Sequence, residues 1–204
     1  MPGASRGRFI TLEGVDGAGK STHVPWIAER LRTGGREVVV TREPGGTPLA
    51  EKLRTRLLSE AIDPQEATRL AFQARADHVQ KVIRPALERG AWVLCDRFTD
   101  STIAYQGAGQ GVPRQQIEAM AQKAHPGLKP DLTLVFDVTY AVSSQRLAGR
   151  PLDKFEAEGA EFFDRVRQAY HHLARREPNR VHMIDGSRAL EEVKKEIEKW
   201  IAVL

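Results

Sequence analysis

The chain of 204 residues has very little cysteine and no long hydrophobic run. Its single cysteine, Cys95, excludes a disulfide framework, and its place in the apolar segment WVLCDR indicates a small buried residue. No window approaches the roughly 18–20 apolar residues of a membrane helix. The first residues also lack the apolar stretch of a secretory signal. We therefore expect a cytoplasmic protein with no membrane partner.

Basic tails and metal-binding patterns are missing as well. The formal net charge is +4, but no lysine-rich tail or aromatic-interleaved basic segment is present, so we expect no nucleic-acid partner. The surplus of positive charge instead suits a site for a small polyanion. The six histidines show no metal-binding spacing, and no serine–histidine–acid arrangement is indicated. We interpret all six as structural or surface residues.

Apolar segments alternate with amphipathic segments along the chain. Strands are predicted at residues 8–14, 37–44, 91–97, 131–138 and 180–187. Helices are predicted at 21–33, 47–60, 64–90, 113–125, 139–149, 160–177 and 189–204, with Pro85 expected to kink or split the third. Several strands are apolar throughout, which favours a parallel five-stranded sheet with helices on both faces. We predict one domain over residues 8–204, after a flexible tail at residues 1–7.

A glycine-rich loop follows the first predicted strand. Residues 14–21, GVDGAGKS, fit the pattern G-x-x-x-x-G-K-[ST] between a strand and a helix. Such glycines let backbone N–H groups surround a phosphate, and the helix N-terminus adds positive potential. Lys20 would reach the terminal phosphates, while the Ser21 hydroxyl is placed to bind Mg²⁺. The loop predicts an α/β fold of the P-loop NTPase type, with ATP bound by Gly14, Val15, Asp16, Gly17, Ala18, Gly19, Lys20, Ser21 and Thr22.

A second Mg²⁺ partner is expected where another strand ends. Asp96 closes the third predicted strand and suits this role, directly or through water. Asp137, at the end of the fourth, is the rival. We favour Asp96 because basic and hydroxyl residues follow it in the sequence.

Three further segments accompany this loop: TREPGGT, CDRFTDSTIAYQG and FDVT. With the loop, they resemble bacterial-type thymidylate kinases from about residue 9 to the final helix. The resemblance implies that ATP and dTMP react to give ADP and dTDP, with Mg²⁺ as cofactor. It also implies a homodimer.

The resemblance assigns roles at the acceptor site. Arg97 resembles an arginine that grips the acceptor phosphate, a task that suits a planar guanidinium. Asp16 resembles an acid that faces the sugar 3′-hydroxyl, and Arg75 an arginine that reaches thymine. Tyr105 would form a wall beside the sugar. The other acceptor residues that the resemblance implies are Glu43, Pro44, Arg54, Ser101, Thr102 and Gln106.

One position departs from this pattern. The family usually places a phenylalanine four residues before the thymine-binding arginine, whereas this chain has Ala71 there and Phe72 next. One residue turns a helix by about 100°. Either Phe72 reaches the base through a local shift, or it is a core residue and another group covers the base. Phe72 is our candidate.

The departure leaves other functions open. One alternative is another nucleoside monophosphate kinase, with dUMP, CMP or GMP as acceptor. A nucleotide-dependent switch is the second, although the N/T-K-x-D motif of a GTPase is absent.

Basic residues after the fourth strand predict a lid at about residues 146–159. By resemblance, such a segment closes over the phosphates and supplies positive charge that this arginine-free loop lacks. Arg150 and Lys154 would then act on the transferring phosphoryl group together with Lys20 and Arg97. Arg146 would lie over the adenine.

Overall fold

The computed structural model describes residues 6–149, 151 and 153–204. Within these residues, five strands form one parallel sheet in the order β2–β3–β1–β4–β5. The strands are β1 (Phe9–Gly14), β2 (Val38–Arg42), β3 (Trp92–Asp96), β4 (Leu132–Asp137) and β5 (Val181–Asp185). The predicted parallel sheet is confirmed. Because β1 lies between β3 and β4, the glycine-rich loop leaves the middle of the sheet.

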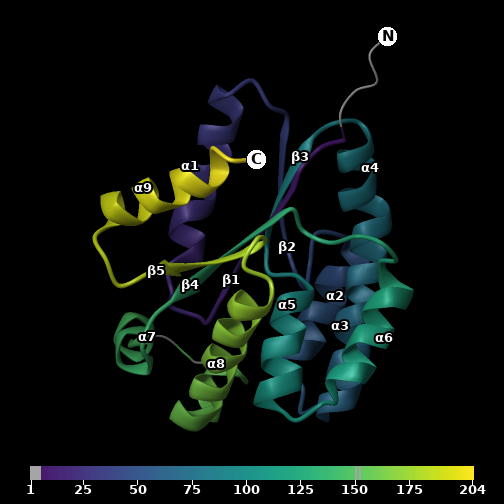
Figure 1. The fold of residues 1–204 in the computed structure, drawn as a ribbon. Helices are drawn as coiled ribbons and strands as arrows, with labels where there is room; N and C mark the ends of the chain where they lie inside the picture. The colour runs from purple at the N-terminus through teal and green to yellow at the C-terminus, as the bar shows by residue number, and fades with distance from the viewer. Residues whose placement is uncertain (1–5, 150, 152) are drawn as a thin grey trace.

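Helices cover both faces of this sheet. They are α1 (Lys20–Thr33), α2 (Pro48–Ser59), α3 (Pro64–His78), α4 (Arg84–Glu88), α5 (Thr99–Thr102), α6 (Arg114–Ala124), α7 (Tyr140–Leu147), α8 (Ala160–Arg176) and α9 (Leu190–Ile201). Figure 1 shows α1 and α9 on one side of the sheet and α4, α5 and α8 on the other. Among the described residues, no helix is long and apolar enough to span a membrane.

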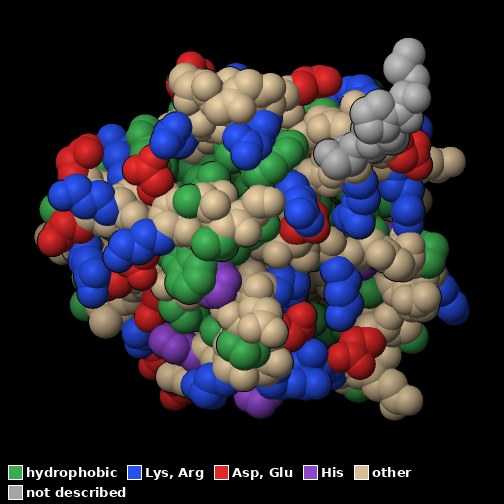
Figure 2. Space-filling model, turned by 45° about the horizontal axis from the view of Figure 1, so that its top comes forward, with side chains coloured by type: hydrophobic (Ala, Val, Ile, Leu, Met, Phe, Trp, Pro, Cys, Tyr) green, Lys and Arg blue, Asp and Glu red, His purple; other side chains and the backbone are tan. Residues whose placement is uncertain are grey.

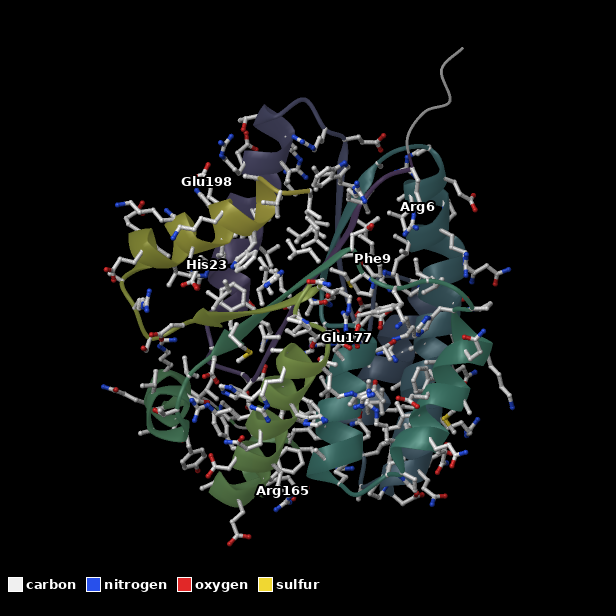
Figure 3. The ribbon with its side chains drawn as sticks, in the orientation of Figure 1. Arg6, Phe9, His23, Arg165, Glu177 and Glu198 are labelled. Atoms are coloured by element: carbon white, nitrogen blue, oxygen red, sulfur yellow. The ribbon has the colours of Figure 1, made fainter. Side chains whose placement is uncertain are left out.

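Alternation along β1 divides its side chains between the two faces. Ile10 and Leu12 belong to the core cluster that also contains Ile27 of α1. Phe9, which Figure 3 labels, points to the other face. There its ring meets Phe98 edge-on, with the centroids 4.9 Å apart. On this second face, side chains of β1 contact the segment that follows β3.

A surface ion pair joins helices α1 and α9. Arg30 of α1 pairs with Glu198 of α9, and Figure 3 labels Glu198.

On the face drawn in Figure 2, Lys and Arg side chains are interspersed with Asp and Glu. At the start of the described chain, Gly7 is buried and donates its N–H to the Leu87 carbonyl, 3.0 Å away.

Two π-helical segments modify the predicted helices, and the first agrees with the expected break of the long helix near Pro85. The long helix is interrupted by a π-helical segment, Val79–Ile83, and Pro85 then lies in the first turn of α4, where its missing N–H is tolerated. A second π-helical segment, Ile103–Gly109, continues α5 and was not predicted. A Cβ at Gly109 would collide with the Phe162 ring of α8, so this glycine permits the close approach of the two segments.

Candidate active site

The glycine-rich loop connects β1 to α1. Gly14, Gly17 and Gly19 have φ values of 124°, 73° and 104°, which side-chain-bearing residues rarely adopt. Lys20 is folded back onto the loop, where its Nζ donates to the carbonyls of Gly14 at 2.9 Å and Val15 at 3.0 Å. Burial, with the nearby Arg97 charge, lowers the pKa of Lys20. The amine is therefore held beside the loop, in a position to bind an anion.

A cavity of about 450 Å³ runs alongside this loop. Its volume is in the range of small-ligand sites. Arg146 of α7 spans it by donating to the carbonyls of Gly17 at 3.0 Å and Gly186 at 2.9 Å. The predicted nucleotide-site residues that line it are Asp16, Gly17, Gly19, Lys20, Ser21, Thr22, Asp96 and Arg146. Val15 and Ala18 are instead buried in the core cluster.

The same cavity contains groups suited to Mg²⁺. The Oδ1 atom of Asp96 is buried and has no hydrogen-bond partner within the described part of the chain. A buried unpaired carboxylate oxygen is unfavourable unless a cation or water binds it. Asp137, the rival, is already engaged by Arg167 at 2.7 Å and His171 at 3.1 Å. Ser21 and Asp96 therefore fit a magnesium ion better than Asp137.

Arg97 lies at the centre of the site. It donates to Asp16 at 2.8 Å, to the Gly14 carbonyl at 3.0 Å and to the Tyr105 hydroxyl at 3.2 Å. Burial alone would raise the pKa of Asp16, but the charges of Arg97 and Lys20 hold that pKa at about 2. Asp16 is consequently ionised and forms a salt bridge that fixes the Arg97 guanidinium.

A second cavity, of about 110 Å³, lies on the other side of this salt bridge. Sequence reasoning did not identify Leu57, Leu58, Phe98, Asp153 and Phe155, which also contribute to its wall. Arg54 is held at the rim by donating to the Pro44 carbonyl at 3.0 Å. The predicted acceptor residues that line this cavity are Asp16, Glu43, Pro44, Arg54, Arg75, Arg97, Ser101, Thr102, Tyr105 and Gln106.

Arg75 is fixed in the acceptor cavity by buried partners. Its Nε donates to Glu43 at 2.6 Å and its Nη1 to the Thr102 hydroxyl at 3.2 Å. The His78 ring contacts Glu43 at 2.9 Å and Thr41 at 2.7 Å. Burial would raise the pKa of Glu43, but Arg75 and His78 lower it below its ordinary value. His78 is fully buried and lies three residues from Arg75 on the same helix face, in agreement with the interpretation of the histidines as structural or surface residues.

Phe72 does not line the acceptor cavity, contrary to our expectation. It is 5% exposed and packs with Val112 and Ile117, while the Arg75 guanidinium lies 4.7 Å from its ring centroid. Ala71 faces the cavity instead, because one residue along α3 rotates the side chain by about 100°. Phe72 is thus a core residue that supports Arg75 from behind.

The lid also differs from the expected basic segment. Lys154 donates to the Ile62 carbonyl at 2.8 Å, in the connection between α2 and α3, and so it does not face the loop. Its neighbours Asp153 and Glu156 each place a carboxylate oxygen within 4.8 Å of one from Asp16. Burial and the nearby charges of Glu156 and Asp16 raise the pKa of Asp153. Arg150 lies outside the described residues.

Comparisons with known proteins agree with this geometry. The family model of thymidylate kinase matches residues 12–197. The thymidylate kinase of Methylobacillus flagellatus is 55% identical over 193 residues, covering 94% of this chain and 95% of that protein. That of Bordetella pertussis is 52% identical over 200 residues, covering 98% and 96%.

A solved structure gives the same result. The crystal structure of thymidylate kinase from Ehrlichia chaffeensis superposes with a TM-score of 0.79 at 34% identity, covering 97% of this chain and 99% of that one. The chain therefore belongs to the thymidylate kinase family.

Proposed function

We propose that this chain transfers the γ-phosphoryl group of ATP to dTMP, giving ADP and dTDP. The observation that carries the proposal is the pair of cavities that meet at the Asp16–Arg97 salt bridge. One runs along the phosphate loop, and the other is lined by Arg54, Arg75 and Arg97. Two anionic ligands brought together need this density of positive charge. The family supports dTMP as the acceptor.

Phosphoryl transfer asks a protein mainly to position the two anions and to neutralise their charge. In our proposal, Lys20 leaves the carbonyls of Gly14 and Val15 to bind the terminal phosphates of ATP. Arg97 holds the acceptor phosphate with its planar fork, and Arg54 approaches the same phosphate from the rim. The acceptor phosphate is the nucleophile and is already ionised at neutral pH, so no general base is assigned.

The rest of the acceptor cavity would recognise the nucleoside. Arg75, held by Glu43 and Thr102, would contact the base, and Gln106 lines the same wall. Tyr105 lies beside Asp16 and Arg97, where it would contact the sugar. Ala71 stands where the family usually has a phenylalanine, and it would face the base from the same wall. Deoxyribose preference is proposed to follow from the wall that Tyr105 forms.

The lid completes the proposed nucleotide site. Arg146 is proposed to lie over the adenine of ATP, since it spans the cavity beside the loop. We retain Arg150 and Lys154 as proposed contributors to charge neutralisation. Lys154 can reach a phosphate only after its bond to the Ile62 carbonyl breaks. A homodimer and a cytoplasmic location belong to the proposal and rest on the resemblance to the family.

Mg²⁺ would be held by Asp96 and the Ser21 hydroxyl, and when bound it supplies positive charge to the ATP phosphates. We expect Asp96→Asn to raise the Mg²⁺ concentration for half-maximal activity by about tenfold or more, because the neutral amide is a weaker ligand. A Mg²⁺ titration at saturating ATP and acceptor measures this. Asp137→Asn is the matched control, and a larger shift for that variant would contradict the assignment.

Phe72 gives a prediction that separates packing from binding. Phe72→Ala is expected to lower the free energy of unfolding by about 3–5 kcal/mol, because it removes a buried ring. The KM for dTMP should rise less than in Arg75→Ala. Urea unfolding and steady-state kinetics measure the two effects. A large increase in KM with unchanged stability would return Phe72 to the base site.

The proposed reaction is tested by an ADP-release assay with ATP, Mg²⁺ and a set of monophosphate acceptors. Turnover with dTMP supports the proposal. Turnover with only dUMP, CMP or GMP would keep the phosphoryl transfer and change the acceptor.

A further inference from the structure

Glu13 is a fully buried carboxylate at the end of β1, directly before the phosphate loop. It accepts hydrogen bonds from the Phe98 N–H at 2.8 Å, from the Tyr170 hydroxyl at 2.9 Å and from the Ser101 hydroxyl. These donors come from the segment after β3 and from α8. An ionisable group that is removed from water is unfavourable unless such partners compensate it.

The groups that Glu13 binds also hold Arg97 in its conformation. Arg97 has a φ of 69° and is the one non-glycine residue with positive φ in the described parts of the chain. Such a conformation persists only where the surroundings enforce it. Glu13 binds the N–H of the next residue, and the Arg97 N–H donates to the Leu12 carbonyl at 2.8 Å. The end of β1 therefore holds the backbone on both sides of the Arg97 Cα.

A second route connects Glu13 to the guanidinium itself. The Ser101 hydroxyl, which donates to Glu13, lies 3.3 Å from Arg97 Nη1 and accepts from it. Glu13 thus orients the hydroxyl that receives an Arg97 hydrogen bond. The carboxylate itself lines neither the cavity beside the loop nor the acceptor cavity. Any effect of Glu13 on the reaction must act through its partners.

We propose that Glu13 is a positioning residue, which holds Arg97 at the junction of the two cavities before the acceptor binds. The proposal rests on the proposed function, since it concerns the arginine assigned to the acceptor phosphate. A charged donor that is already in place needs no reorganisation when the phosphate arrives. That advantage explains why a carboxylate occupies a position where an apolar side chain would be easier to bury.

The proposal concerns hydrogen-bond geometry and not the charge of Glu13. Burial, with a contribution from Asp100, raises the pKa of Glu13 to about 7, against the opposing effects of Ser101, Arg97 and Tyr170. Hydroxyl groups accept hydrogen bonds as well as donate them. A protonated Glu13 can therefore donate to a hydroxyl while it still accepts from the Phe98 N–H. Glutamine can make the same set of bonds without charge.

The test compares Glu13→Gln with Glu13→Ala in steady-state assays with dTMP and ATP. Glu13→Ala should lower kcat/KM for dTMP by about 10²-fold, because it frees Arg97, and change the KM for ATP by less than about threefold. Glu13→Gln should remain within about tenfold of the wild type. Equal losses in the two variants would show that charge matters and would overturn the proposal. A folded Glu13→Ala with unchanged dTMP kinetics would overturn it too.

A double-mutant cycle distinguishes positioning from general damage to the fold. In an Arg97→Ala background, Glu13→Ala should produce little further loss, because the residue through which it acts is gone. Fully additive losses would contradict the proposal. If Glu13→Ala does not fold, Tyr170→Phe replaces it in the cycle, with an expected loss of about two- to fivefold from one missing hydrogen bond.

Crystal structures of the variants test the positioning without relying on turnover. Glu13→Gln should keep the positive φ of Arg97 and its contact with Asp16, while Glu13→Ala, or Tyr170→Phe in its place, should displace the guanidinium. An unmoved guanidinium would contradict the positioning role. Should the wild type phosphorylate another acceptor, the proposed function would fail, and the cycle run with that acceptor would still test Glu13.

Discussion

Arg97→Ala is expected to lower kcat/KM for dTMP by about 10²–10³-fold, which is the usual effect of removing one preorganised donor. Arg97 is held between the cavities by Asp16, the Gly14 carbonyl and Tyr105, so its loss removes charge where the two anions meet. The KM for ATP should change by less than about threefold, because the loop and Lys20 remain. Steady-state kinetics with each substrate varied measure the two constants.

Two further variants complete this experiment. Arg97→Lys retains a charge but not the planar fork, so its activity should lie between those of the wild type and the alanine variant. Arg89→Ala removes an exposed arginine that pairs with Glu37, and it should leave both constants unchanged. Equal losses of affinity for ATP and dTMP in Arg97→Ala would refute the assignment of Arg97 to the acceptor.

Lys20→Met is expected to lower kcat by about 10²–10³-fold, since it removes the cation proposed to bind the terminal phosphates of ATP. Methionine keeps an unbranched side chain of similar length, so the buried stem remains packed. The variant also loses the two bonds to the loop carbonyls. Single-turnover kinetics with saturating ATP and dTMP measure the effect on the chemical step.

The control for Lys20 is Lys52→Met, which changes an exposed lysine of α2. This variant should have the activity of the wild type. If Lys20→Met keeps full turnover, the phosphate loop does not serve the reaction in the way proposed, and the nucleotide site must be reassigned.

Most of the fold was predictable because its signals are local. Apolar strands and amphipathic helices alternate along the chain, and the parallel sheet follows from strands that are buried on both faces. The loop at residues 14–21 was also predictable, since the glycines of its pattern permit the backbone conformations that a phosphate site needs. The segment at 99–109 was missed because its glycines and polar residues resemble a loop, whereas packing on α8 orders it.

The site was harder to predict where side-chain direction decides the outcome. Phe72 and Ala71 are neighbours in sequence, and only the rotation of α3 determines which one faces the cavity. Lys154 lies in a segment with the basic composition of a lid. Its hydrogen-bond partner, however, is the Ile62 carbonyl, which is distant in sequence. Glu13 offered a usable signal that we did not exploit: an acid inside a mostly apolar strand indicates specific buried partners.

The central claim is that this chain phosphorylates dTMP with ATP. A coupled ADP-release assay with ATP, Mg²⁺ and separate samples of dTMP, dUMP, dCMP, CMP and dGMP tests it most directly. We predict strong turnover with dTMP and much weaker turnover with the other acceptors. Strong turnover with a different acceptor, or ATP binding without turnover for any of them, would contradict the account.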